Sequence, residues 1–224
     1  DDAPLLHDDV FTQGPNPPPT KPSNLSVDFT MEMGDLTAGF AEADVIVERT
    51  YRVPMCHQGY IEPHAAVARA DENGRVEIWC CTQGHFMVRS MTAEITGIEL
   101  GKIKVTASEI GGGFGGKTII YLEPLALVLA RKSGKPVKMV MSREEVMRAS
   151  GPTSGSKSTV KIGAKKDGTI VAAQGTYWLQ AGAFPGSPIR GAAGCSFAPY
   201  NIPNVHSFGY DVVSNRSKVA AYRA

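Results

Sequence analysis

The chain of 224 residues is long enough for one large domain or two small ones. Apolar residues make up 42% of it, an ordinary share for a globular protein, so wholesale disorder is excluded. Its formal charge of +1 favours neither nucleic acid nor an anionic membrane surface as a partner. No apolar run approaches the roughly 20 residues of a membrane span.

The chain begins Asp1-Asp2-Ala3-Pro4, without a starting Met, a basic region or an apolar stretch. We therefore expect no signal peptide, and we expect the sequence to be a processed or excised piece. The four cysteines show no CxxC spacing, which argues against a disulfide scaffold, an iron–sulfur site and a zinc site. We interpret them as buried reduced thiols of a cytoplasmic protein.

Residues 1–27 are predicted to be a linker, because the Pro-rich run at 14–19 has no periodicity and favours an extended chain. Helical and alternating patterns follow in turn. Helical spacing predicts helices over 35–43, 86–96, 119–131 and 143–149. Alternation or β-branched composition predicts strands over 44–53, 75–81, 102–110, 136–141, 157–165, 169–179 and 206–213, with 136–141 buried.

Turn residues separate these elements. Gly97 and Gly134 are expected to end helices, and Asp167-Gly168 between two alternating runs predicts a hairpin. Residues 182–203 are rich in Gly and Pro and are predicted to be loops. Together the pattern predicts an α+β fold, with helices packed on a mixed sheet and no internal repeat.

A glycine-rich loop at residues 111–118, Gly-Gly-Gly-Phe-Gly-Gly-Lys-Thr, fits the pattern GxxxxGK[ST] of phosphate-binding loops. It follows a predicted strand and precedes a predicted helix, which is the context that this motif requires. Such a turn can present backbone N–H groups to an anion, because no Cβ blocks the approach. Taken alone, the loop predicts a P-loop nucleoside-triphosphatase.

Other features weigh against that interpretation. A triphosphatase needs an acidic residue at the end of a later strand to hold Mg²⁺, but the strand at 137–141 runs into Ser142-Arg143. The loop also lies halfway along the chain, and Phe114 among five glycines indicates a side chain that faces something. The triphosphatase therefore stays as the least favoured alternative, which loss of MgATP binding in Lys117→Ala would support.

Four segments point to another function. They are Met-Cys-His-Gln-Gly-Tyr-Ile-Glu-Pro-His at 55–64, Cys-Thr-Gln-Gly-His at 81–85, the glycine loop, and Ala-Tyr-Arg at 221–223. In order and rough spacing they resemble the molybdopterin-binding large subunit of molybdenum hydroxylases, the xanthine dehydrogenase and aldehyde oxidase family. The resemblance implies that residues 28–224 are the first half of the molybdopterin-binding region, incomplete at the C-terminus. Residues 1–27 would then be the end of a preceding domain.

In that family the molybdenum is held by the dithiolene sulfurs of molybdopterin, so no side chain is expected to bind the metal directly. The resemblance implies that the backbone of Gly112, Gly113, Phe114 and Gly115 lies against the ligands of the metal. A backbone N–H at this place is chemically reasonable, since an oxo ligand accepts a hydrogen bond from a fixed donor.

The resemblance also implies that Gln58 hydrogen-bonds the metal's oxo group and that Arg223 orients the substrate, as a guanidinium can grip a carbonyl or a carboxylate. The alternatives are a Gln58 that caps loop backbone groups and an Arg223 that is a surface charge. Four further polar residues are expected to be structural rather than catalytic: Glu62, His64, His57 and His85.

Two departures from the family pattern narrow the expected activity. Thr118 stands where purine-oxidising members carry a glutamate, and Ala224 stands where carbon monoxide dehydrogenases carry a copper-binding cysteine. The resemblance therefore implies a hydroxylase of aldehydes or N-heteroaromatic compounds, with water as the oxygen source.

The expected cofactor is molybdopterin with molybdenum, with its cytosine dinucleotide form left open. Iron–sulfur clusters and FAD are expected on partner subunits or domains. The family's general base is a distant C-terminal glutamate with no match here, so we expect this chain alone to be inactive. A non-catalytic assembly or cofactor-handling module stays as the alternative function.

Overall fold

The computed structural model describes residues 3–223, which form two compact units. Unit 1 consists of Asp1–Cys56 and Ser154–Val219, and unit 2 of His57–Thr153 and Ala220–Ala224. The region predicted as one domain over 28–224 is thus built from two units, each with its own mixed sheet. The α+β class with helices packed on mixed sheets is confirmed. Within the described range, no helix has the length and apolar character needed to cross a membrane.

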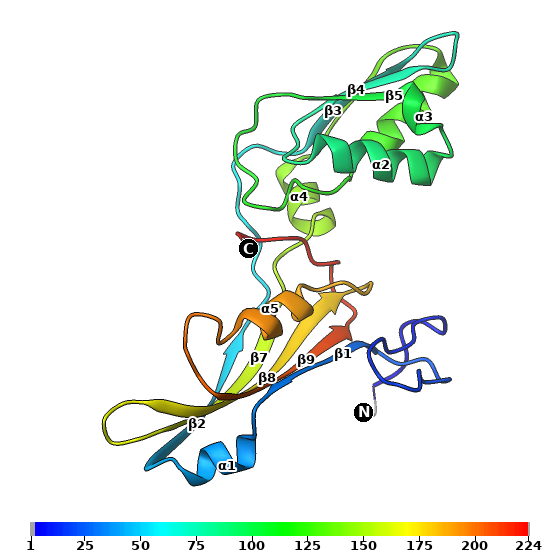
Figure 1. The fold of residues 1–224 in the computed structure, drawn as a ribbon. Helices are drawn as coiled ribbons and strands as arrows, with labels where there is room; N and C mark the ends of the chain where they lie inside the picture. Colours follow the sequence, from blue (N-terminus) through cyan, green and yellow to red (C-terminus); the bar gives the residue numbers. More distant parts are fainter. Residues whose placement is uncertain (1–2, 224) are drawn as a thin grey trace. The chain divides into compact units, whose positions relative to one another are not determined.

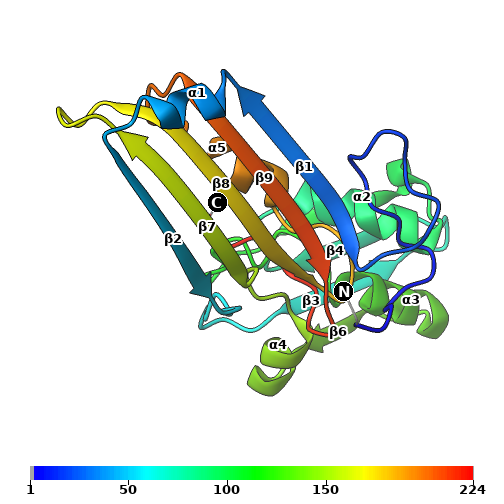
Figure 2. The ribbon, with the colours of Figure 1, turned by 90° about the horizontal axis from the view of Figure 1, so that it is seen from below.

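Unit 1 contains a five-stranded sheet in the order β1-β9-β8-β7-β2 (Figure 1, Figure 2). All neighbouring pairs are antiparallel except β8 and β9. The strands are β1 (Leu25–Met33), β2 (Val45–Val53), β7 (Ser156–Ala164), β8 (Ile170–Gly182) and β9 (Asn204–Val213), and the helices are α1 (Leu36–Ala41) and α5 (Ile189–Cys195). The predicted hairpin at Asp167-Gly168 is confirmed, with Gly168 at φ +90°.

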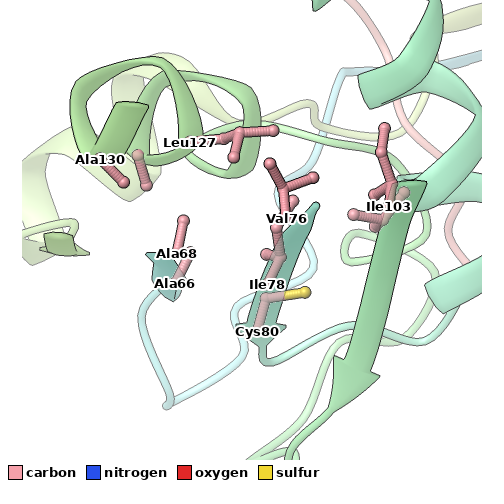
Figure 3. Packing of buried hydrophobic residues seen from close by; sticks show 10 residues of the cluster. Ala66, Ala68, Val76, Ile78, Cys80, Ile103, Leu127 and Ala130 are labelled. Atoms are coloured by element: carbon pink, nitrogen blue, oxygen red, sulfur yellow. The ribbon is translucent and has the colours of Figure 1, made fainter. Parts of the chain in front are cut away.

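Unit 2 contains a four-stranded sheet in the order β5-β4-β3-β6. Its strands are β3 (Ala65–Ala70), β4 (Val76–Cys80), β5 (Ile103–Ala107) and β6 (Val137–Val140), and its helices are α2 (His85–Thr96), η1 (Leu100–Lys102), α3 (Glu123–Ser133) and α4 (Arg143–Ala149). Figure 3 shows side chains of β3, β4 and β5 facing Leu127 and Ala130 of α3. This apolar layer fixes the strands whose ends lead into the glycine loop.

The predictions missed four elements and misjudged two. The missed elements are β1, β3, η1 and α5. β3 has the sequence Ala-Ala-Val-Ala-Arg-Ala, in which a single β-branched residue gives little strand signal. β6 is the edge strand of its sheet and alternates between half-buried and exposed residues, so its prediction as buried was wrong.

The helix predicted from residue 119 begins only at Glu123. Pro124 lies in its first turn, where a proline is tolerated because that N–H has no partner inside the helix. A start at 119 would put Pro124 in the helix interior, so the prediction was wrong. Residues 118–122 are turn and irregular chain instead.

Only two of the four cysteines are buried. Cys80 and Cys81 lie in the interior of unit 2, in agreement with the prediction. Cys56 and Cys195 are exposed, so the prediction of burial was wrong for them. Cys56 lies in the irregular chain after β2, and Cys195 is the last residue of the short helix α5, where neither side chain is covered by a sheet.

The end of α3 offers a test of local backbone strain. Gly134 follows the helix at φ +65°, and a Cβ there would meet no atom within 4 Å. Gly134→Ala should therefore lower the free energy of unfolding by about 1 kcal/mol, from the left-handed backbone alone. Gly101→Ala is the matched control, because the φ of Gly101 is not left-handed and a Cβ there would make only an ordinary contact, with Glu99 Oε1 at 3.6 Å. Urea unfolding of both variants measures the difference, and equal stabilities would contradict the prediction.

Candidate functional site

The glycine loop in unit 2 lies between β5 and α3 and is tied to two other segments of the same unit. Glu62 Oε2 accepts a hydrogen bond from the Gly111 N–H at 2.7 Å, and Gln83 Oε1 accepts one from the Gly115 N–H at 2.9 Å. Lys117 closes the loop, and its carbonyl accepts from the Gln83 N–H at 2.9 Å and from the Thr82 hydroxyl at 3.0 Å. Both ends of the loop are therefore fixed by neighbouring chain.

Lys117 has the opposite placement from a phosphate-binding lysine. Its side chain is fully buried and its Nζ lies 2.6 Å from Glu62 Oε2, with the Tyr60 ring 5.0 Å away. Moreover, α3 begins at Glu123, so the loop does not lead directly into a helix as the loop of a P-loop protein does. A P-loop lysine must be available to phosphate oxygens, and this one is engaged. The structure gives the P-loop alternative no support.

Two more of the segments singled out in the sequence, 55–64 and 221–223, also contact this loop. Gln58 Nε2 donates to the Ala221 carbonyl at 2.8 Å, and the Arg223 N–H donates to the Phe114 carbonyl at 2.9 Å. Gly115 packs so closely on Ala221 that a Cβ at Gly115 would lie 2.6 Å from the Ala221 oxygen. Gln58, the loop and the segment 221–223 therefore form one cluster, although they lie far apart in the sequence.

Several polar groups of this cluster have no partner within residues 3–223. Gln58 is 6% exposed, and its Oε1 atom is buried without a hydrogen bond. The backbone N–H groups of Gly112, Gly113 and Phe114 also find no acceptor in the described chain, although Gly112 is only half-buried and Phe114 is exposed. An unpaired buried polar atom is costly, so such atoms commonly mark a place where a ligand or water binds.

Phe114 and Arg223 are the two described non-glycine residues with positive φ, at 50° and 46°. A left-handed backbone is unfavourable for an aromatic residue, and such strain concentrates at binding sites. Phe114 nevertheless remains 49% exposed, so burial of the ring does not account for the conformation. The strained backbone of Phe114 is consistent with the sequence-based expectation that its side chain faces another group.

A buried hydrogen-bond network supports the loop on the side of Tyr60. The Tyr60 hydroxyl lies 2.7 Å from His64 Nε2 and 3.0 Å from Ser150 Oγ, and His57 Nε2 lies 2.8 Å from the same Ser150 oxygen. The Tyr60 side chain in turn packs on Gly112 and Gly116. His57 and His64 thus both take part in this hydrogen-bond network.

Burial sets the protonation of this network. It lowers the pKa of His64 to about 4, with a further contribution from the Lys117 charge, and it lowers the pKa of His57 together with the Arg143 charge. Burial also raises the pKa of Tyr60. Burial alone would raise the pKa of Glu62, but hydrogen bonds from Lys117 and Gly111 and the Lys117 charge lower it overall. The lowered pKa values therefore favour an ionised Glu62 beside neutral His57 and His64.

The stability of unit 2 should consequently fall as the pH drops from 6.5 to 4. The unfolded chain takes up a proton on His64 near pH 6.5, whereas the folded chain does so only near pH 4. The stabilisation from neutral His64 is complete above pH 6.5 and is lost on the way down to pH 4, to a total of about 3 kcal/mol. Urea unfolding across this range should show a steeper slope for the wild type than for His64→Gln. Equal slopes for the wild type and His64→Gln would contradict the stabilisation expected from neutral His64.

Three further residues named in the sequence analysis are His85, Thr118 and Ala224. His85 begins α2, and its ring is tilted against that of Phe86, with 4.2 Å between the ring centroids. Thr118 donates its hydroxyl to the Gly115 carbonyl at 2.8 Å. Ala224 lies outside the described residues. No group of three or more His, Cys, Asp or Glu that could hold a metal ion occurs in residues 3–223. Gln83 was missed as a site residue, although it belongs to the quoted segment 81–85.

Comparison with known proteins decides the family. Residues 18–224 match the model of the molybdopterin cofactor-binding domain. The chain belongs to this family. The resemblance read from the four sequence segments is thereby confirmed.

The relatives of this molybdopterin-binding domain are longer than this chain. The chain is 34% identical over 197 residues to a probable xanthine dehydrogenase subunit of Bacillus subtilis, covering 85% of this chain and 26% of the relative. It is 32% identical over 197 residues to the nicotinate dehydrogenase large molybdopterin subunit of Eubacterium barkeri, covering 86% of this chain and 46% of the relative. The chain thus spans a quarter to a half of the length of these relatives.

Solved structures show the same fold. Aldehyde oxidoreductase from Desulfovibrio gigas matches with a TM-score of 0.83 at 29% identity, over 89% of this chain and 22% of that one. The Cu,Mo-CO dehydrogenase matches with a TM-score of 0.84 at 28% identity, over 99% of this chain and 29% of that one.

The cluster at the glycine loop fits what a molybdopterin-binding domain must offer. An anionic cofactor with oxygen ligands needs neutral donors, and the free N–H groups of Gly112, Gly113 and Phe114 are such donors. Gln58 adds an amide whose orientation is set by the Ala221 carbonyl, because the reverse orientation would place two oxygens 2.8 Å apart. Its buried oxygen is then left to accept from a bound group.

Proposed function

We propose that this chain forms one wall of the molybdenum cofactor site of a hydroxylase that oxidises an aldehyde or an N-heteroaromatic compound with water as the oxygen source. The observation that carries the proposal is the convergence of Gln58, the glycine loop and residues 221–223 around unpaired polar groups. Supporting evidence comes from relatives whose names include xanthine dehydrogenase, nicotinate dehydrogenase and aldehyde oxidoreductase.

Molybdopterin with its molybdenum supplies the two-electron oxidation when bound. The residues of this chain bind and orient. The N–H groups of Gly112, Gly113 and Phe114 would donate to oxygen atoms on the cofactor, and the unpaired Oε1 of Gln58 would accept from an N–H or O–H of the bound group. These groups are neutral, so they add no charge beside an anionic cofactor. Their fixed backbone positions need no rearrangement when the cofactor binds.

Arg223 is assigned to the substrate. Its backbone is bonded to Phe114 and its side chain is exposed, so its guanidinium is available next to the loop. A guanidinium holds a carbonyl or carboxylate oxygen through two parallel hydrogen bonds. Thr118 supports a substrate other than a purine, since the acidic group that the family's purine-oxidising members carry there is absent from this position.

We assign the remaining parts of the enzyme to partner chains or to sequence outside these 224 residues. Two relatives are named as a subunit of xanthine dehydrogenase and as the large molybdopterin subunit of nicotinate dehydrogenase, which supports partners within a multi-subunit enzyme. We assign iron–sulfur clusters and FAD to those partners, and we place the general base outside this chain. The cytosine dinucleotide form of the cofactor and a cytoplasmic location belong to the same proposal, the latter because Cys80 and Cys81 are buried thiols.

Labelled water tests the reaction. The protein that carries this chain, purified from its source, should oxidise an aldehyde or an N-heteroaromatic compound and take the new oxygen from oxygen-18 water. Residues 1–224 expressed alone in cells that make molybdopterin should show no turnover, because they lack the base. Label that enters from O₂ would overturn the proposed reaction, and stoichiometric cofactor with turnover in the isolated chain would overturn the assignment of a partial site.

A further inference from the structure

Two side-chain oxygens hold the glycine loop, and each accepts from two of its donors. Glu62 Oε2 accepts from the Gly111 N–H at 2.7 Å and from Lys117 Nζ at 2.6 Å. Gln83 Oε1 accepts from the Gly115 N–H at 2.9 Å and from the Lys117 N–H at 3.3 Å. These two side-chain oxygens therefore hold Gly111 at the start of the loop and Gly115 and Lys117 near its end, in addition to the bonds that neighbouring chain makes to the loop carbonyls.

The pattern of these bonds sorts the donors of the loop into two groups. The N–H groups at the ends, on Gly111, Gly115 and Lys117, are satisfied by side chains. The N–H groups in the middle, on Gly112, Gly113 and Phe114, have no acceptor within the described chain. A loop with five glycines has a large conformational entropy when unrestrained, so the fixed ends decide where the middle donors lie.

Gln83 is itself fixed against the loop. Its backbone N–H donates to the Lys117 carbonyl, and the hydroxyl of the adjacent Thr82 donates to the same oxygen. A Cβ at Gly113 would lie 2.4 Å from Gln83 Oε1, so the glycine permits direct contact between the loop and the amide. Glu62 is held in the same way by its bond to the buried Lys117 ammonium.

We propose that Gln83 and Glu62 are positioning residues that set the three free N–H groups of the loop at the distance and direction the cofactor requires. This inference rests on the proposed function for the identity of the ligand. Gln83 carries the clearer test, since its oxygen is bonded to backbone donors only, whereas Glu62 is also half of the buried ion pair.

Hydrogen exchange and metal content test this role in the protein purified with its cofactor. Gln83→Met removes the acceptor and keeps the length of the side chain, and Gln83→Glu keeps an acceptor oxygen. Gln83→Met should raise the exchange rate of the amides of Gly115 and Lys117 by about fivefold, the loss of one ordinary hydrogen bond. Molybdenum retained after gel filtration should fall severalfold, and Gln83→Glu should restore both. Glu94→Gln, an exposed change on α2, is the control.

The outcomes separate the two proposals. Faster exchange with lost molybdenum supports positioning, whereas unchanged exchange and unchanged molybdenum in Gln83→Met overturn it. If the wild-type protein contains no molybdenum, the proposed function fails, and the exchange of the loop amides still decides whether Gln83 holds the loop. If Gln83→Met does not fold, Gln83→Asn, whose shorter side chain withdraws the oxygen, replaces it under the same criteria.

Discussion

Gly115→Ala should remove the cofactor site and destabilise unit 2 by about 2–4 kcal/mol. Gly115 has φ +99°, which an alanine adopts only with strain, and the new Cβ would lie 2.6 Å from the Ala221 oxygen and 2.7 Å from its carbonyl carbon. Both atoms belong to the backbone, so the segment 221–223 must move. That movement breaks the Gln58–Ala221 hydrogen bond and the contact between Arg223 and Phe114.

Gly74→Ala is the matched control for this substitution. Gly74 has φ +75° in a turn of the same unit, and a Cβ there would meet nothing within 4 Å. It carries the backbone strain without the collision, so it should lower the free energy of unfolding by only about 1 kcal/mol. Urea unfolding and molybdenum analysis of both variants give the comparison. Equal stability and equal molybdenum in the two would contradict the packing described for Gly115.

Lys117→Ala should lower the free energy of unfolding by about 3 kcal/mol, the low end for breaking a buried ion pair. The ammonium is fully buried, whereas the side chain of Glu62 is 33% exposed and regains some hydration when its partner is removed. The double variant Glu62→Gln/Lys117→Met should recover much of the loss, because a neutral pair of similar volume leaves no unpaired charge.

Lys104→Ala provides the surface counterpart. Lys104 pairs with Glu77 at 2.7 Å, but its side chain is 72% exposed, so its removal should change stability little. Chemical unfolding of the four proteins measures the effect. A loss for Lys117→Ala no larger than for Lys104→Ala would contradict the burial of the pair. The wild type should not bind MgATP, so Lys117→Ala has no such binding to abolish.

The elements with strong local signals could be predicted from the sequence. The β7–β8 hairpin follows from Asp167-Gly168 between alternating runs, and α4 has an acidic first turn with a Ser142–Glu145 capping box. β3 could not be predicted, because its alanines are buried by α3 and not selected for strand propensity. Pairing within the sheet explains why β3 is extended, and a single sequence does not show which strands lie beside it.

The site was predicted by a different kind of signal. Motif order in the sequence indicated Gln58, the glycine loop and Arg223, and the structure brings all three together. The local pattern GxxxxGK[ST] alone pointed to a triphosphatase, because the pattern does not reveal that Lys117 is turned inward to Glu62. Glu62 was expected to be structural without a named partner, and Gln83 had no assigned role, since hydrogen bonds across 49 and 32 residues leave no periodic trace.

Molybdenum and pterin analysis of the protein that carries this chain, purified from its source, tests most directly whether the glycine loop and Gln58 form a molybdenum cofactor site. We expect one molybdenum and one pterin per copy of the chain in the wild type, and loss of both in Gly115→Ala but not in Gly74→Ala. A folded wild-type protein without molybdenum or pterin, isolated from cells that make the cofactor, would contradict the account.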